Sequence, residues 1–554
     1  MAVRTKYAKN PSSFIALNPS FFSHLLSLSP FNSMQISPRK ASTSRRSTSY
    51  LSLILLFLLV SAAFLAICTL TFATLWRNSI SCSIISSLAS SSSTRFPTRD
   101  YDPFFAAIST SAAAAAATVP LPPQRMPVAG NVSDQEREFW QQPEDEGYRP
   151  CLHFSYHYRK ASAAIAKEKR RFLVVVVSGG LNQQRNQIVD AVVIARILEA
   201  ALVVPVLQVN RIWRDESEFS EIFDVEHFKK ILKADVRIVS SLPSSHLVSK
   251  QTIENQIPFH VSPIWIRARF FRQLNREGLL ILKGLESKLS KNLPPDLQKL
   301  RCKVAFHALR FAGPIQDLSN RVARRMWVEG PYIAIHLRLE KDVWIRSGCP
   351  AGLGAGYDRI ISKERESHPE FLTGKLNITN AQRRLAGLCP LNASEMARLL
   401  KALGAPHNAR VYVAGGEPFG GKLALQALQE EFPNLMSKHT LAREDELTPY
   451  LTKASVLAAI DYIVSLNSDV FVTSHGGNMA RALEGHRAYL GHRKYIKPNK
   501  RMMFPYLDYA FLSETEFSSM MRKLHKKCQG QPQPRTNKRD RDVLAYPVPE
   551  CMCK

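Results

Sequence analysis

Acidic residues are scarce in this chain of 554 residues: 46 Asp and Glu stand against 74 Lys and Arg, which gives a formal net charge of +28. Residues 1–50 hold seven Lys or Arg and no acidic residue, so +21 of the charge belongs to the rest of the chain. This balance favours nucleic acid, an anionic polymer or a nucleotide diphosphate as the partner. Zinc-finger spacings and RNA-binding signatures are absent, which disfavours nucleic acid.

Closely spaced cysteines are also few: only Cys551 and Cys553 lie near each other in the sequence. The nine Cys are scattered, and without a Cys-x-x-Cys pair the sequence gives no indication of a zinc site. Disulfides form in a secretory lumen, and the sequence leaves their pairing open. The cysteines that we expect to take part are Cys151, Cys302, Cys349 and Cys389.

Two familiar nucleotide-binding motifs are incomplete. The dinucleotide fingerprint Gly-x-Gly-x-x-Gly does not occur after the first apolar strand. Gly416, Gly421 and Lys422 match the start of a phosphate loop, but Leu423 stands where that motif needs Ser or Thr to hold magnesium. The sequence therefore disfavours an ATPase and predicts a loop-to-helix connection at this place.

Charge is wholly absent from residues 51–76, a run of 26 residues that exceeds the roughly 20 needed to cross a bilayer. Basic residues lie just before the run and only Arg77 lies just after it, so the positive-inside rule places the N-terminus in the cytosol. A transit peptide or a cleaved signal peptide is the alternative. The long leader and the length of the run favour a single-pass type II membrane protein.

Composition divides the remaining chain. We expect a basic disordered tail (1–50), the membrane segment (51–76), a lumenal stem (77–165), an N-terminal lobe (166–325), a C-terminal lobe (326–525) and a flexible tail (526–554). Sequons that a lumenal enzyme would expose begin at Asn131, Asn377 and Asn392.

Both lobes carry the pattern of an α/β fold. Short apolar runs at 172–178, 201–207, 332–337, 411–414 and 469–472 predict buried parallel strands. Helices are expected at 186–200, 227–233, 279–289, 296–310, 392–403, 423–432, 455–465 and 479–483, with Asn392 or Ser394 capping the fifth of them. We expect residues 349–380 to be rich in loops. The basic residues expected on a solvated face are Lys494, Lys497, Lys500 and Arg501.

Polar side chains end the central strand. His336, Arg338 and Glu340 share one side of the chain where the apolar run stops. Open α/β sheets bind ligands at this carboxyl edge, and the planar fork of Arg338 suits a phosphate. The loops 179–185 and 473–478 follow strands in the same way, and their glycines and polar residues predict anion or sugar cradles. A solvated charged loop is the alternative interpretation.

Three motifs now stand in order: Gly179-Gly-Leu-Asn-Gln-Gln-Arg, His336-Leu-Arg-Leu-Glu-Lys-Asp and Ser474-His-Gly-Gly-Asn-Met-Ala. Together with Ala414-Gly-Gly-Glu and Glu431-Phe-Pro-Asn-Leu, this set resembles the plant branch of the GDP-fucose protein O-fucosyltransferase family, from about residue 172 to residue 500. The resemblance implies a GT-B-type fold, in which two Rossmann-like lobes enclose a cleft. It also implies a Golgi membrane anchor, inverting transfer and no required metal.

The resemblance also implies roles for single residues. Arg338 would hold the donor diphosphate and stabilise the leaving group. From residue type and position, Glu340 and Asp342 are carboxylates suited to a general base, and His336 is a third candidate. The residues expected to bind substrate are Gly180, Asn182, His336, Leu337, Arg338, Asp469, Ser474, His475, Gly477 and Asn478.

The predicted activity is therefore transfer of fucose from GDP-fucose to a hydroxyl of a protein or cell-wall glycan. Two alternatives stay open. The plant branch includes enzymes that resemble pectin rhamnosyltransferases, which would use UDP-rhamnose, and an inactive glycan-binding scaffold would keep the same fold.

Overall fold

The structure of the protein is a computed structural model that describes residues 133–167, 170–210, 213–244, 253–254, 257–286, 288–373, 378–508, 512–536 and 541–554. The predicted membrane segment, most of the predicted stem and the sequons at Asn131 and Asn377 lie outside these residues. No helix of the described part is both long and apolar enough to span a membrane.

The N-terminal lobe is an α/β unit. In chain order it contains β2 (Phe172–Val177), α5 (Leu181–Leu198), β3 (Ala201–Val203), β4 (Val206–Leu207), α6 (Phe219–Ile222), α7 (Val225–Leu232), β5 (Ile238–Val239), β6 (Ile253–Glu254), α8 (Pro263–Glu277), β7 (Leu279–Lys283), α9 (Pro295–Lys303) and the π-helix η3 (Val304–Ala308). The sheet has the order β5-β3-β2-β7-β6, with β4 also paired to β2, and every pairing is parallel. Parallel sheets are covered on both faces, which accounts for the run of Leu and Val in β2.

The C-terminal lobe repeats this arrangement. After the connecting helix α10 (Gly313–Trp327) it contains β8 (Tyr332–His336), α11 (Lys341–Ser347), α12 (Ala355–Ser367), η4 (Pro369–Phe371), α13 (Asn380–Leu385), α14 (Ala393–Ala402), β9 (Arg410–Ala414), α15 (Lys422–Glu431), β10 (Leu435–Ser437), α16 (Lys438–Leu441), η5 (Thr448–Tyr450), α17 (Ala454–Asn467), β11 (Val470–Thr473), α18 (Asn478–Tyr489), β12 (Tyr495–Ile496), α19 (Lys500–Asp508) and α20 (Glu514–His525). Its sheet has the order β10-β9-β8-β11-β12 and is also parallel throughout. The predicted α/β class is confirmed by these two parallel sheets.

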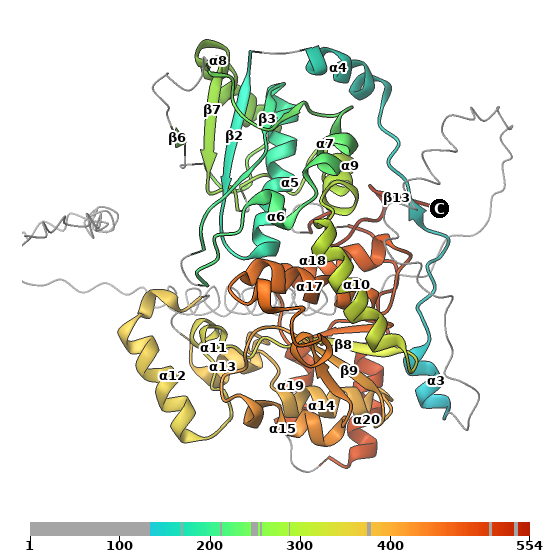
Figure 1. Cartoon of the computed structure of the whole chain (residues 1–554). Coiled ribbons are helices and arrows are strands. Elements are labelled where there is room, and N and C mark those ends of the chain that lie inside the picture. The colour runs from blue at the N-terminus through green and yellow to red at the C-terminus, as the bar shows by residue number, and fades with distance from the viewer. Residues whose placement is uncertain are drawn as a thin grey trace, which may run out of the picture. The chain divides into compact units, whose positions relative to one another are not determined.

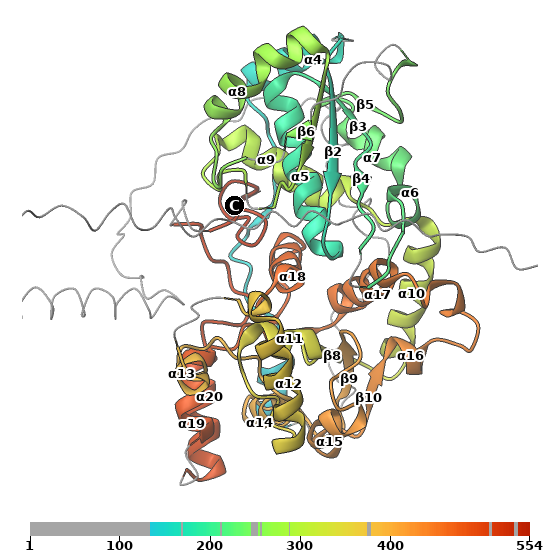
Figure 2. The same cartoon turned by 90° about the vertical axis from the view of Figure 1, so that its left-hand side faces the viewer.

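Two helices of the C-terminal lobe make the junction between the lobes. Both α17 and α18 contact α5, and they lie between the two sheets in both views (Figures 1 and 2). Asp215 of the N-terminal lobe accepts a hydrogen bond from the backbone N–H of Ser455, in the first turn of α17, at 2.6 Å. Lys453 forms an ion pair with Glu221 across the same junction. The polar start of α17 is therefore satisfied by the other lobe.

The described residues of the C-terminal tail are packed against the rest of the protein. Val543 and Met552 are buried, and the two-residue strand β13 (Met552–Cys553) pairs with β1 (Arg149–Pro150). Disulfides join Cys151 to Cys553 and Cys302 to Cys551. The Pro-rich, polar composition suggested flexibility, but these bonds attach the tail to the N-terminal lobe, and a further disulfide joins Cys349 to Cys389.

The predicted stem (77–165) extends too far along the sequence, because helices packed on the lobes already begin at residue 134. Residues 134–140 form α3, and its Phe139 and Trp140 are buried in the core of the C-terminal lobe. Residues 156–167 form α4, where Tyr158 donates to Asp235 of the N-terminal lobe at 2.9 Å. Low complexity thus ends before residue 134, since a few aromatic side chains suffice to hold these helices on the lobes.

Other sequence predictions fail for local reasons. Residues 279–283 of the predicted helix 279–289 form the strand β7, because this apolar run is short and is buried in a parallel sheet. Residues 349–380 contain the 13-residue helix α12. Lys494 is buried and donates to the carbonyl of Phe139, so the predicted solvated face is wrong at this residue. Asn392, rather than Ser394, caps α14.

Packing of the tail gives a testable prediction. A Cβ on Gly485 of α18 would lie 1.6 Å from the carbonyl oxygen of Leu544 in the tail, whereas a Cβ on Gly356 of α12 would meet nothing within 4 Å. We expect Gly485→Ala to lower the free energy of unfolding by about 1–3 kcal/mol. Gly356→Ala should leave it unchanged or raise it by up to about 1 kcal/mol. Denaturant midpoints measure both, and equal midpoints would contradict the packing of the tail on α18.

Candidate functional site

Arg338 lies where the loops after β8 and β11 meet. Its backbone N–H donates to Oγ of Ser474 at 2.9 Å, and the N–H of Ser474 donates to the carbonyl of His336 at 3.0 Å. Ser474 is fully buried, so its hydroxyl holds the turn. The Arg338 side chain stays 30% exposed, and a Cβ on Gly477 would lie 3.7 Å from its Nη1. Gly477 is the N-cap of α18, so the guanidinium lies beside the start of that helix.

This arrangement is suited to an anion. The first N–H groups of a helix have no partner within the helix, and the helix dipole adds positive potential at the same end. A guanidinium beside them can bind two phosphate oxygens at once. A Cβ on Gly476, in the loop before α18, would meet no atom within 4 Å, so there is open space on this side. We call Arg338, His475, Gly476 and Gly477 the cradle.

Glu340 holds Arg338 in place. One carboxylate oxygen accepts from Nε of Arg338 at 3.4 Å, and the other accepts from the backbone N–H of Gly416 at 3.0 Å. A Cβ on Gly415 would lie 2.5 Å from the carbonyl oxygen of Leu337, so glycine is required where the loop after β9 crosses the loop after β8. Gly415, which directly precedes the partial match to a phosphate loop, therefore serves a close backbone approach.

Three predicted residues do not face the cradle. Asp342 lies in the first turn of α11 with its carboxylate 3.7 Å from Arg346. Leu337 is 2% exposed and belongs to the core of the C-terminal lobe. Asp469 accepts from the backbone N–H of Tyr332 at the amino ends of β8 and β11, the edge of the sheet opposite the cradle. The strand direction that brings Arg338 and Ser474 together thus separates Asp469 from them.

The histidines of this edge are neutral. Burial lowers the pKa of His336 to about 3, with Arg338 acting in the same direction. Burial also lowers the pKa of His475 to about 3, with Lys500 and Arg338 acting in the same direction. Nδ1 of His336 has no hydrogen-bond partner among the described residues. Neither imidazole carries a charge near neutral pH.

A buried carboxylate that the sequence did not single out supports the same edge. Asp461 of α17 accepts from the hydroxyl of Tyr412 at 2.7 Å, from the N–H of Gly415 at 3.1 Å and from Nζ of Lys438 at 2.9 Å. Lys438 also donates to the carbonyl of Gly415 at 2.7 Å. This network fixes the loop after β9. The polar residue inside the apolar helix was the available signal for it.

The N-terminal lobe contributes the start of α5. Gly180 is the N-cap of this helix, and its N–H donates to Oε1 of Gln183 at 3.0 Å. Asn182 is 7% exposed, and its Oδ1 lies 3.4 Å from Nη1 of Arg185. The Arg185 guanidinium lies over the ring of Tyr462 in α17, 4.3 Å from the ring centroid. Asn182 therefore lies behind Arg185, which makes the contact with the C-terminal lobe.

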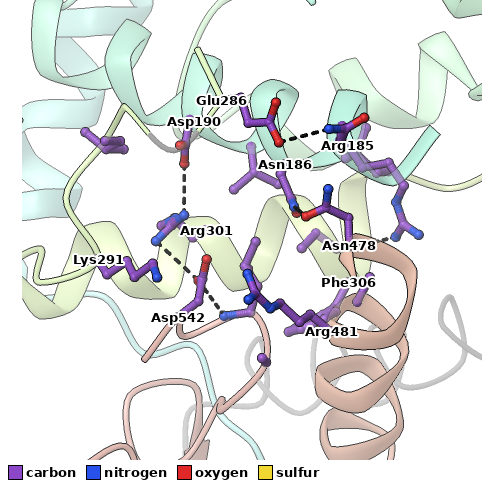
Figure 3. Close-up of a pocket in the computed structure, with 18 of the residues that line it drawn as sticks. Arg185, Asn186, Asp190, Glu286, Lys291, Arg301, Phe306, Asn478, Arg481 and Asp542 are labelled. Carbon is purple, nitrogen blue, oxygen red and sulfur yellow. Dashed lines mark hydrogen bonds and ion pairs between the residues drawn. The ribbon is translucent and has the colours of Figure 1, made fainter. Parts of the chain in front are cut away.

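A small cavity, about 80 Å³, lies where α5, α9, α18 and the tail meet. In Figure 3, Asn186 of α5 and Asn478 of α18 point toward each other, and Nδ2 of Asn186 lies 3.4 Å from Oδ1 of Asn478. Arg301 extends between Asp190 and Asp542, at 3.0 and 3.4 Å (Figure 3). Asn186 was missed from the sequence because it lies within a run of polar residues, 182–187, at the start of α5, where nothing distinguishes it from its neighbours.

The predicted residues thus form two groups, one in each lobe. Gly180 and Asn182 lie at the start of α5 in the N-terminal lobe. His336, Arg338, Ser474, His475 and Gly477 gather at one sheet edge, and Asn478 joins them to the N-terminal lobe through Asn186. Within the described part of the chain, no group of three or more His, Cys, Asp and Glu could hold a metal ion.

Solved structures with a related chain trace exist at low sequence identity. POFUT1 in complex with GDP-fucose is 12% identical, with a TM-score of 0.35 over 60% of this chain and 99% of its own. The fucosyltransferase NodZ from Bradyrhizobium is 13% identical, with a TM-score of 0.33 over 60% and 97%. Scores of this size decide nothing about the fold, which rests on the two parallel sheets.

The sequence comparisons are much stronger. O-fucosyltransferase 37 of Arabidopsis thaliana is 66% identical over 84% of this chain and 84% of its own length. O-fucosyltransferase 20 of the same plant is 59% identical over 76% and 73%. A family model described as GDP-fucose protein O-fucosyltransferase matches residues 172–490, a range that includes β2, the cradle and α18. This chain belongs to the GDP-fucose protein O-fucosyltransferase family and is a glycosyltransferase.

Proposed function

We propose that this protein is an inverting O-fucosyltransferase that transfers fucose from GDP-fucose to a hydroxyl of a protein or cell-wall glycan. One observation carries the proposal: the Arg338 guanidinium lies beside Gly477, at the N-terminus of α18. A cation and free helix N–H groups at one place suit the diphosphate of a nucleotide sugar. The description of the family supplies the identity of that nucleotide sugar.

The chemistry that the cradle supports is stabilisation of the leaving group. The acceptor oxygen forms a bond to C1 of fucose while the bond from C1 to the diphosphate oxygen breaks, and GDP leaves with the electron pair. Negative charge therefore grows on the diphosphate in the transition state. Arg338 and the first N–H groups of α18 are already oriented toward that place, so they lower the barrier without reorganising. We propose that these groups do the work that a metal ion does in other glycosyltransferases.

Glu340 is better suited to holding Arg338 than to taking a proton. Both of its oxygens are occupied, by Nε of Arg338 and by the N–H of Gly416. Asp342 lies two residues further on, in the first turn of α11, and forms an ion pair with Arg346. The acceptor is expected between the lobes, where the weak 3.4 Å contact between Asn186 and Asn478 can be exchanged for hydroxyl groups of the two substrates.

We further propose that the enzyme is a single-pass type II protein of the Golgi membrane with its lobes in the lumen. The uncharged run 51–76 and the basic residues before it support this topology. The disulfides between Cys302 and Cys551 and between Cys349 and Cys389 add support, because such bonds persist in a secretory compartment.

Arg338→Ala tests the cradle directly. Loss of a charge-assisted contact to phosphate should weaken GDP binding about 10- to 100-fold and reduce fucosyl transfer at least as much. Arg346→Ala is the matched control, because Arg346 lies in the same lobe and faces Asp342 instead of the cradle. Calorimetric titration with GDP, GDP-fucose, UDP and UDP-rhamnose, in the absence of metal, gives the affinities.

The same titration separates the alternatives. Tighter binding of the uridine pair than of the guanosine pair would replace fucosyl by rhamnosyl transfer. A folded protein that binds none of the four nucleotides would be a scaffold. Equal GDP affinity of the wild type and of Arg338→Ala would remove Arg338 from the site.

The neutral histidines predict how GDP binding depends on pH. Because burial holds the pKa of both His336 and His475 near 3, neither imidazole gains a proton between pH 8 and pH 5. GDP affinity should therefore show no histidine titration in this range. A transition near pH 6 that disappears in His336→Asn or His475→Gln would contradict the buried, neutral state of these side chains.

A further inference from the structure

We propose that Lys500 is a positioning residue for the donor: by donating to Nδ1 of His475, it holds this imidazole as the tautomer whose Nε2–H donates to a phosphate oxygen. The inference rests on the proposed function, because it concerns the same cradle. It assigns a role to a lysine that the sequence placed on a solvated face.

The contacts of Lys500 are specific. Its ammonium group donates to the carbonyl oxygen of Cys389 at 2.5 Å and lies 3.0 Å from Nδ1 of His475. Cys389 is fixed by its disulfide to Cys349, so the carbonyl that orients the ammonium group is itself held in place. Lys500 is the first residue of α19, and it reaches back to the loop after β11.

Lys500 lacks a counter-charge. Among the described residues no carboxylate forms an ion pair with it, and the nearby Glu395 is paired with Arg384 at 2.6 Å. Burial lowers the pKa of Lys500 to about 8 as a result. An ammonium group removed from water without an anion is costly, and a bound diphosphate would supply the missing negative charge.

Lys497, three residues earlier, differs from Lys500 because it has a carboxylate partner. Its ammonium group lies 3.2 Å from the carboxylate of Glu484 and 2.9 Å from the hydroxyl of Tyr546. Burial lowers the pKa of Lys497, but Glu484, Tyr495 and Tyr546 together raise it by more, so the net shift is the reverse of that at Lys500. The two lysines are alike in type and segment, and only one of them contacts the cradle.

The bond to Lys500 decides the tautomer of His475. An ammonium group has donors only, so Nδ1 must be the acceptor and must carry no proton. The proton of a neutral imidazole is then on Nε2, which makes Nε2 a donor. His475 lies between Ser474, which binds the N–H of Arg338, and Gly477, which lies beside its guanidinium. Nε2–H is thus a further donor at the place where phosphate oxygens are expected.

GDP binding to the full-length protein tests the proposal. We expect Lys500→Met to weaken GDP binding about tenfold, as for loss of one hydrogen bond to a charged group. Lys497→Met should change it less than twofold. His475→Gln keeps an N–H near the position of Nε2 and should retain most of the affinity, whereas His475→Asn reaches only the position of Nδ1 and should lose about as much as Lys500→Met.

A double-mutant cycle separates positioning from simple charge attraction. In the His475→Gln background, Lys500→Met should cost less than twofold, because no tautomer remains to be held. An equal loss in both backgrounds would show that Lys500 acts through its charge alone and would overturn the inference. Equal GDP affinity of Lys500→Met and Lys497→Met would also overturn it.

Two controls keep the outcomes distinct. If the wild type itself binds no GDP, the proposed function fails, whereas a wild type that binds GDP beside unaffected Lys500 and His475 variants refutes only this inference. Melting temperatures without ligand report folding of each variant. Should Lys500→Met not fold, the comparison of His475→Gln with His475→Asn still decides, since both leave Lys500 in place.

Discussion

The parallel pairing of β8 with β11 sets His336 opposite Thr473, so the loops that follow these strands leave the sheet side by side. Everything in the cradle depends on this register. The hydroxyl of Ser474 can reach the N–H of Arg338 only because the two chains emerge at the same level. A slip of one residue would turn Arg338 toward the core, where an unpaired guanidinium is strongly disfavoured.

Around this pairing, neighbouring groups restrict the Arg338 side chain. Glu340 binds its Nε and is itself held by the N–H of Gly416, whose loop is fixed by Asp461 and Lys438. The helix α18 begins at the guanidinium and extends to the tail, where Gly485 meets Leu544. The orientation of the Arg338 guanidinium thus depends on the loops after β8, β9 and β11. Through α18 it also depends on the C-terminal tail, which packs on that helix.

Much of the fold could be predicted from the sequence, because short apolar runs between helices are a strong signal for parallel strands. The strands β2, β8, β9 and β11 fall where the sequence placed them, to within one residue. The segment 279–289 was assigned to a helix because a short apolar run has no distinctive period, and only pairing with β2 decides it. The tail was missed because its order depends on disulfides whose partners are distant in the sequence.

For the site, the motifs identified residues but not what each of them touches. Arg338 and Gly477 were found because they follow strands. Asp469 was placed with them by the resemblance alone, although it stands at the start of its strand and therefore at the edge of the sheet opposite the cradle. Asn186 and Lys500 were missed because the first looks like a helix position and the second like a surface lysine. Long-range contacts give both residues their significance.

Hydrogen exchange of the backbone amides with and without GDP tests the cradle most directly. If the diphosphate binds at the start of α18, exchange of the amides from His475 to Arg481 should slow when GDP is added, and the loop from Gly415 to Gly421 should change less. Slowed exchange in that second loop, with none at the start of α18, would contradict the assignment of the cradle and place the nucleotide elsewhere on the C-terminal lobe.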